Sequence, residues 1–212
     1  MKKTLLVVVI LILAVSIPFY LKSKKTVVSD KTVASYSNTR LGIAFTYPKI
    51  LSASSTPDSV NIHHQIPFTH HDFCDFKGES DTTIDTMTDF DVTFRVVNKN
   101  ILETMKSESP YIPQENFVNN EVIPSPGFID RFKVGNLEGF QIFEGAEGCG
   151  HTIYYLKVSD QKTLVIINKL ITVFTGSIDV ANKNRAEAVP GVINKEKSEE
   201  IFMSILGSMK AN

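Results

Sequence analysis

The chain has 212 residues, of which 42% are hydrophobic and 21% are charged. This composition can fill a packed core and is too apolar for an intrinsically disordered chain. Five of the 22 basic residues lie within the first 25 positions, which leaves 17 basic against 23 acidic residues, a formal net charge of −6, for the rest. Nucleic-acid binding requires clustered Lys and Arg to neutralise phosphates, so this balance excludes a nucleic-acid partner.

The N-terminus combines a basic start, residues 1–3, with an uncharged apolar stretch, residues 4–21. Eighteen apolar residues are near the lower limit for a helix that spans a bilayer. An apolar segment ahead of a long hydrophilic chain is typical of an export signal, so we expect a single-pass membrane anchor with the C-terminal domain extracytoplasmic. Lysines flank the segment on both sides, so this orientation rests on the segment's position and not on the positive-inside rule.

A secreted protein is the alternative. Ala14 and Ser16 are small residues at the two positions that a signal peptidase requires, and cleavage there would release the domain. The apolar run continues to Leu21, which favours an uncleaved anchor. The lysine-rich start and short anchor are typical of a bacterial protein.

The remaining chain predicts a linker and one domain. Residues 22–35 are small, polar and charged, as in a short linker, and residues 36–212 have the length of a single domain. Alternating apolar residues predict strands at 43–47, 60–66 and 90–96.

The next segments predict loops and a short helix. Residues 67–86 and 109–127 are irregular, the second with four prolines, and read as long loops. A short helix is expected over 101–105, and residues 164–167, apolar on both faces, predict a central strand. Further antiparallel strands are expected at 128–134, 137–143, 151–158 and 163–174.

The chain ends in a polar loop, residues 176–194, and an amphipathic helix over 195–209. Strands with helices against one face predict an α+β fold, with a central antiparallel sheet flanked by helices and preceded by one transmembrane helix.

Two polar patterns lie within the predicted strands. His64 shares a face with Val60 and Ile62, so we expect a hydrogen-bonded core or edge histidine. The charged residues in and beside the strand at 90–96 are expected to form a solvated face: Asp89, Asp91 and Arg95.

Both ends of the domain resemble PsbP-like (Mog1/PsbP) domains. The opening segment matches as Tyr36-x5-Gly42-Ile43-x-Phe45-x-Tyr47-Pro48, and the closing helix as Ile201-Phe202-x2-Ile205-Leu206-x-Ser208-x-Lys210. These segments cover about 23 of the 212 residues. The resemblance implies a central antiparallel sheet flanked by helices and a non-catalytic role in binding or assembly at a membrane, and it carries over no catalytic residue. The chain departs from the family in having no Trp, and its two long loops look like insertions.

The chain has two cysteines, Cys74 and Cys149. In an exported domain, two cysteines most simply form one disulfide. Such a bridge would fasten the loop at 67–86 to the sheet. Two separate buried thiols are the alternative.

All five histidines lie near the cysteines in sequence, which allows a metal site. Cys and His are the ligands that zinc prefers, and the cluster at 63–75 and 149–151 adds Asp residues. The spacing matches neither a zinc finger nor a metalloprotease, and bridged sulfurs cannot ligate, so we expect no cofactor. Zinc stays the alternative, with candidate ligands His70, His71, Cys74, Cys149 and His151.

No motif for a nucleophile elbow, a phosphate loop or a dinucleotide site occurs in the sequence. The sequence therefore predicts a membrane-anchored extracytoplasmic domain for binding or assembly, which is non-catalytic and whose protein or small-molecule partner is unknown. The alternative function is a metal-binding site or a metal-dependent enzyme.

Overall fold

The computed structural model describes residues 32–74, 82–146, 148–176 and 180–211. The chain divides into two units, Met1–Val33 and Ala34–Asn212, and the elements below belong to the second, whose first strand begins at Val33. The predicted membrane helix at 4–21 lies outside the described residues. Among the residues that are described, no helix is both long and apolar enough to cross a membrane.

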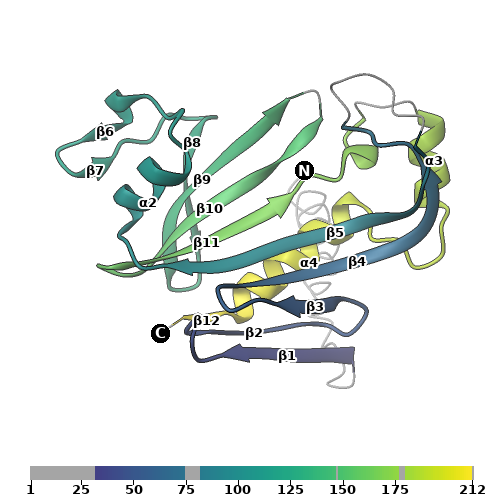
Figure 1. Cartoon of the computed structure of the whole chain (residues 1–212), viewed down its shortest axis with the longest axis horizontal. Helices are drawn as coiled ribbons and strands as arrows, with labels where there is room; N and C mark the ends of the chain where they lie inside the picture. Colours follow the sequence, from purple (N-terminus) through teal and green to yellow (C-terminus); the bar gives the residue numbers. More distant parts are fainter. Residues whose placement is uncertain (1–31, 75–81, 147, 177–179, 212) are drawn as a thin grey trace, which may run out of the picture. The chain divides into compact units, whose positions relative to one another are not determined.

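A seven-stranded sheet dominates the fold, with the strand order β3-β4-β5-β11-β10-β9-β8 and every neighbouring pair antiparallel (Figure 1). The predicted central strand is confirmed, since β11 lies in the middle and buries Leu164 and Ile166 on one face and Val165 on the other. The strands are β3 (Ser52–Ser55), β4 (Ser59–His70), β5 (Ile84–Val97), β8 (Ile129–Val134), β9 (Leu137–Ala146), β10 (Cys149–Ser159) and β11 (Lys162–Lys169).

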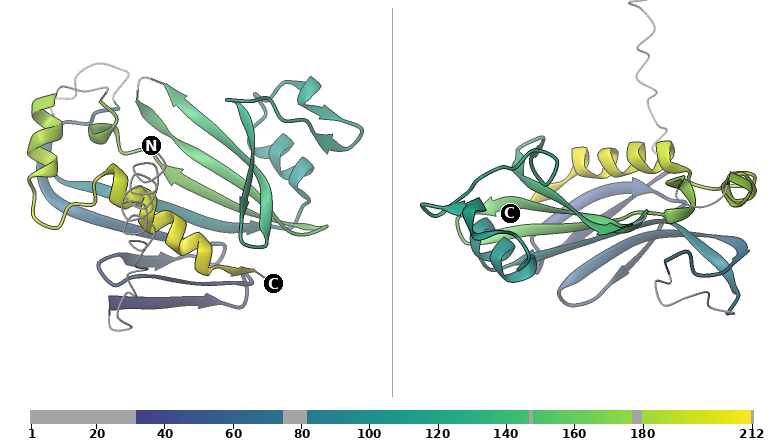
Figure 2. Two further views of the ribbon diagram at one scale, coloured as in Figure 1. Left: turned by 180° about the vertical axis from the view of Figure 1, so that it is seen from behind. Right: turned by 90° about the horizontal axis from the view of Figure 1, so that it is seen from above.

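Helix α4 (Lys195–Ser208) covers one face of this sheet (Figure 2). Its apolar stripe packs Phe202 against Tyr154, with ring centroids 5.2 Å apart. A three-stranded sheet packs into the same core, where the ring centroids of Phe45 and Phe94 lie 4.9 Å apart. Its strands, in spatial order, are β1 (Val33–Asn38), β2 (Ile43–Pro48) and β12 (Lys210–Ala211).

Helix α2 (Ile101–Glu108) packs on the opposite face, where Met105 is fully buried against Val165. Its N-terminus is capped by Asn100, whose side chain accepts the Glu103 amide at 2.9 Å. A small hairpin follows a 3-10 turn at Gln114–Asn116, with strands β6 (Phe117–Val118) and β7 (Glu121–Val122). A third helix, α3 (Val180–Glu187), packs at the end of β4 and β5 with a 3-10 turn at Thr172–Phe174.

The predicted fold class is wrong. The protein is mostly β and not α+β, because strands hold more than twice as many described residues as α-helices do, although its large sheet is antiparallel as predicted. Two of the three described helices have only 8 residues. The terminal helix at 195–209 is confirmed almost to the residue, whereas the predicted loop at 67–86 is shorter, since β4 continues to His70 and β5 starts at Ile84.

A β-bulge decides how the long strands meet α4. His64 pairs with Phe90 and Gln65 with Thr88, so Asp89 is an extra residue on β5. The bulge turns Asp89 into the interior, where it is fully buried. The prediction that Asp89 belongs to a solvated face is therefore wrong. Its carboxylate contacts His64 Nδ1 at 2.7 Å and accepts the Ile193 amide at 2.7 Å. The predicted hydrogen-bonded histidine is thus confirmed.

We expect Asp89→Ala to lower the free energy of unfolding by about 3 kcal/mol, because the substitution leaves a buried amide and an imidazole without their charged partner. Asp85→Ala, on the exposed part of the same strand, is the control and should cost under about 0.5 kcal/mol. Urea unfolding measures both, and equal losses in the two variants would contradict the role of Asp89.

Candidate functional site

The two cysteines form the predicted disulfide. Cys74 and Cys149 are bridged, with their Cα atoms 5.7 Å apart and a separation of 75 positions in sequence. The Thr172 hydroxyl lies 3.0 Å from Cys74 Sγ and 3.5 Å from Cys149 Sγ. The bridge joins the segment after β4 to the start of β10. Thr172, which contacts both sulfurs, lies in the segment that follows β11.

The predicted metal ligands do not converge. His70 stacks on Phe73, with ring centroids 4.8 Å apart, and its Nδ1 lies 2.5 Å from the carbonyl oxygen of His71. His151 instead pairs with Glu144, with Nε2 and Oε2 3.2 Å apart. In this oxidised form neither sulfur is a thiolate, and the described part of the chain holds no group of three or more His, Cys, Asp or Glu side chains suited to one metal ion.

A polar network on the α2 face joins a serine, a carboxylate and a histidine. Ser109 donates to Glu144 at 2.9 Å and lies 2.8 Å from the Tyr155 hydroxyl, and Tyr111 also donates to Glu144. The serine meets the carboxylate and not the imidazole of His151, so this is not the nucleophile–base contact of a hydrolase. The network joins the end of α2 to strands β9 and β10.

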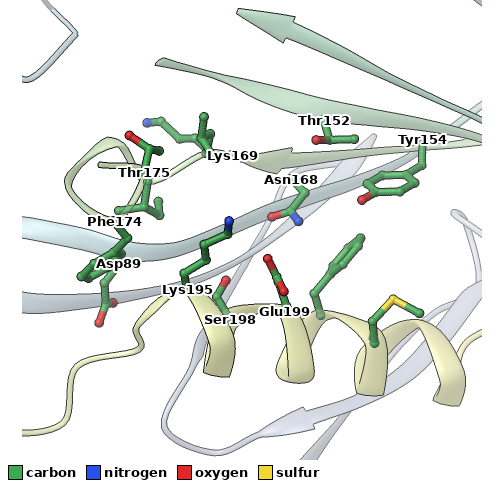
Figure 3. A pocket seen from close by; sticks show the side chains of 14 residues that line it. Asp89, Thr152, Tyr154, Asn168, Lys169, Phe174, Thr175, Lys195, Ser198 and Glu199 are labelled. Atoms are coloured by element: carbon green, nitrogen blue, oxygen red, sulfur yellow. The ribbon is translucent and has the colours of Figure 1, made fainter. Parts of the chain in front are cut away.

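On the other face, a cavity of about 370 Å3 separates α4 from the ends of β10 and β11 (Figure 3). We call it the helix–sheet cavity. Its apolar lining comes from both layers and from the segment after β11, and consists of Tyr154, Leu170, Ile171, Phe174, Phe202 and Met203. This volume lies at the lower end of the range of small-molecule sites.

Polar side chains of the sheet point into this cavity toward α4 (Figure 3). Thr152 and Asn168 lie on neighbouring strands in direct register, and Asn168 donates a hydrogen bond to the Tyr154 hydroxyl. Burial raises the pKa of Tyr154, the charge of Glu199 raises it further, and the Asn168 hydrogen bond opposes both. The phenol is therefore neutral at physiological pH and can donate or accept a hydrogen bond.

The first turns of α4 supply the opposite wall. Lys195 and Glu199 are four residues apart, so they lie on one face of the helix with opposite charges, and Ser198 lies beside them. Asp89 lies at the inner end, where one carboxylate oxygen contacts the His64 ring and the other accepts the Ile193 amide. The charges around the cavity therefore compensate one another.

None of these cavity residues was among the predicted site residues. The amphipathic pattern identified α4 and Phe202 as core, but only the fold shows that α4 leaves a space beside the sheet. One local feature was informative: Asn168 directly follows the apolar run 164–167 on a central strand, where a polar side chain needs a partner.

No protein-family model matches the sequence, and neither does any curated protein. One similar solved structure is a crystal structure from Bacteroides thetaiotaomicron VPI-5482, with a TM-score of 0.42 and 8% identity. The match covers 84% of this chain and 48% of the other, so the chain spans about half the length of that neighbour. A likeness this distant carries no argument about fold or function, and the site is argued from its own residues.

We expect the double substitution Cys74→Ser with Cys149→Ser to lower the free energy of unfolding by about 4 kcal/mol, since the bridge closes a loop of 75 residues in the unfolded chain. Urea unfolding in oxidising buffer measures the difference. The free energy of unfolding of the parent protein should fall to that of the variant once reductant is added. Equal stabilities of the oxidised parent and the variant would contradict this contribution.

The raised pKa of Tyr154 predicts a loss of stability in alkali. The folded protein holds this proton more tightly than the unfolded chain, so the contribution is complete below the unfolded pKa of about 10 and is lost as pH rises through the folded pKa. Urea unfolding at increasing pH should show the free energy of unfolding falling above about pH 10, less steeply in Tyr154→Phe. Identical slopes in both proteins would contradict the burial of this phenol.

Proposed function

We propose that the chain is a membrane-anchored extracytoplasmic domain that binds an uncharged amphipathic small molecule in the helix–sheet cavity. The observation that carries the proposal is the cavity itself, which combines an apolar lining with Asn168, Thr152 and Ser198 as hydrogen-bonding groups. Concave sites with a mostly apolar lining and a few convergent polar groups are typical of small-molecule binding.

The charges around the cavity favour an uncharged ligand. Lys195 and Glu199 oppose each other on the rim, and a net charge on the ligand would meet attraction from one and repulsion from the other. Aromatic rings of Tyr154 and Phe202 supply flat apolar surface beside the amide of Asn168. A ligand with an apolar ring can pack on these aromatic rings, and a hydroxyl or amide group at its end can hydrogen-bond to Asn168.

Binding is proposed in preference to catalysis because the innermost acid of the cavity has a structural role. Asp89 has both oxygens in hydrogen bonds that hold the loop before α4, so neither is free to move a proton on a ligand. Glu199 and Lys195 are exposed on the rim, where water solvates their charges and leaves them no special acid or base strength.

The extracytoplasmic location rests on two supports. The apolar segment at 4–21 has the position of an export signal, and the Cys74–Cys149 disulfide suits an oxidising compartment. Kinship with PsbP-like domains is part of the proposal and rests on the two end segments. These segments lie side by side, since the Thr46 amide on β2 donates to Ser208 Oγ at the end of α4 at 2.9 Å.

The proposal is tested by filling the cavity. Ser198→Trp adds an indole to the cavity wall, whereas Ser204→Trp places the same indole on the exposed side of the same helix. Saturation-transfer NMR with phenol- and indole-sized fragments, each bearing one hydroxyl or amide group, should show binding to the parent and to Ser204→Trp. Ser198→Trp should lose about tenfold or more in affinity.

Two results would contradict the proposal. Fragments that bind the two tryptophan variants equally well would place their site elsewhere. A complete lack of binding to the parent at millimolar concentrations would show that the cavity does not serve uncharged amphipathic molecules.

A further inference from the structure

A second cavity lies on the opposite face of the sheet, beside the disulfide. The described residues outline a volume of about 630 Å3 there, walled by Cys74 and Cys149 on one side and by strands β5, β11, β10 and β9 below. Most of its lining surface is apolar, and the apolar side chains beside the bridge are Ala146 and Ile167. We call it the disulfide cavity.

A row of ionisable side chains crosses the floor of this cavity. In the strand register Glu144 lies opposite His151, and His151 opposite Lys169, while Lys169 approaches Asp91 on the next strand. Neighbouring strands are about 4.8 Å apart, so the row spans three inter-strand steps. Its order is acid, imidazole, amine, acid, on one face and within one cavity.

The acids at the two ends are held by neutral donors. Ser109 and Tyr111 donate to Glu144, and Asn61 donates to Asp91 at 2.5 Å. Donors of this kind fix a carboxylate in place without neutralising it, as the supporting residues of a binding site do. Both acids are also shielded from solvent, with side chains 24% and 26% exposed.

The pair at the β5 end of the row, Lys169 and Asp91, is not in hydrogen-bond contact. Lys169 Nζ lies 3.9 Å from Asp91 Oδ2, which is too long for a hydrogen bond and leaves both charges able to bind other groups. A ligand carboxylate can accept from the Lys169 ammonium while a ligand ammonium donates to Asp91. The cavity therefore matches a molecule that carries both charges within one inter-strand step.

Two glycines let the backbones of β9 and β10 approach closely beside the disulfide. At Gly145 a Cβ atom would come within 2.0 Å of the Cys149 carbonyl oxygen, and at Gly150 within 2.1 Å of the Glu144 carbonyl oxygen. The two strands of the hairpin thus meet without side chains next to the bridge.

We propose that the disulfide cavity is a second binding site, which takes a compact zwitterion of the amino-acid type. The ligand carboxylate binds Lys169, its ammonium binds Asp91, and its side chain contacts Ile167 and the disulfide. The sheet lies between this site and most of the helix–sheet cavity, and Lys169 at the end of β11 lines both.

Three probes of one carbon skeleton test the charge requirement. L-Leucine carries both charges, 3-methylbutylamine lacks the carboxylate, and 4-methylpentanoate lacks the ammonium. Isothermal titration of the full-length chain, with glycine as a smaller zwitterion, should show L-leucine binding at least about tenfold more tightly than either singly charged probe, since each lost charge removes one charge-assisted hydrogen bond.

Two variants locate the site. Lys169→Gln should weaken L-leucine binding about tenfold or more, and because Lys169 is 60% exposed the substitution leaves the fold intact. The matched control is Lys157→Gln, which removes an exposed lysine paired with Asp160 at the far end of strand β10. This variant should bind L-leucine with the affinity of the parent protein. Ser198→Trp, in the other cavity, should also leave L-leucine binding unchanged.

The proposal is overturned by any of three results. The first is a lack of heat with both zwitterions at millimolar concentrations. The second is binding of a singly charged probe as tight as that of L-leucine, and the third is an equal effect of Lys169→Gln and Lys157→Gln.

Discussion

The rest of the structure depends on one buried carboxylate. Asp89 reaches the interior only because a bulge adds a residue to β5, and there it holds His64 of β4 and the amide of Ile193 in the loop before α4. A buried carboxylate must be hydrogen-bonded on both oxygens to be tolerated. The bond to Ile193 holds the residue before the N-cap of α4, the helix that forms one wall of the helix–sheet cavity.

The disulfide has the corresponding role on the opposite face. It fastens the segment after β4 to the hairpin of β9 and β10, where Gly145 and Gly150 allow close backbone approach. The sheet thus presents two concavities, one toward α4 with charges of both signs around it and one beside the bridge with the row from Glu144 to Asp91 on its floor. Both lie near the ends of β10 and β11, so these two central strands supply residues to each.

Local patterns predicted the parts of the fold that depend on local chemistry. The alternation of Phe90 to Phe94 and the stripe of α4 follow directly from burial on one face. The disulfide followed from two cysteines in a chain whose N-terminal segment predicts export. The short helix α3 escaped prediction because only Ala186 is buried along it, so it has no apolar stripe to recognise.

Features that depend on register or on a bulge could not be predicted. Asp89 alternates in sequence with Phe90 and Asp91 as a surface residue does, and only the extra residue on β5 turns it inward. The row from Glu144 to Asp91 brings together residues more than 50 positions apart, and a shift of one residue in any strand would disperse it. The predicted α+β class failed because regular pairing continues through segments whose polar composition suggested loops.

The small sheet carries a consequence for how the chain folds. Strand β2 has its outer partner in β12, and the bond between Thr46 and Ser208 spans 162 positions. Contacts of such high sequence separation form late, because the intervening chain must first be ordered. A chain made from its N-terminus therefore keeps the edge of β2 that pairs with β12 uncovered until the last residues arrive. This interval is when the domain is most exposed to aggregation and proteolysis.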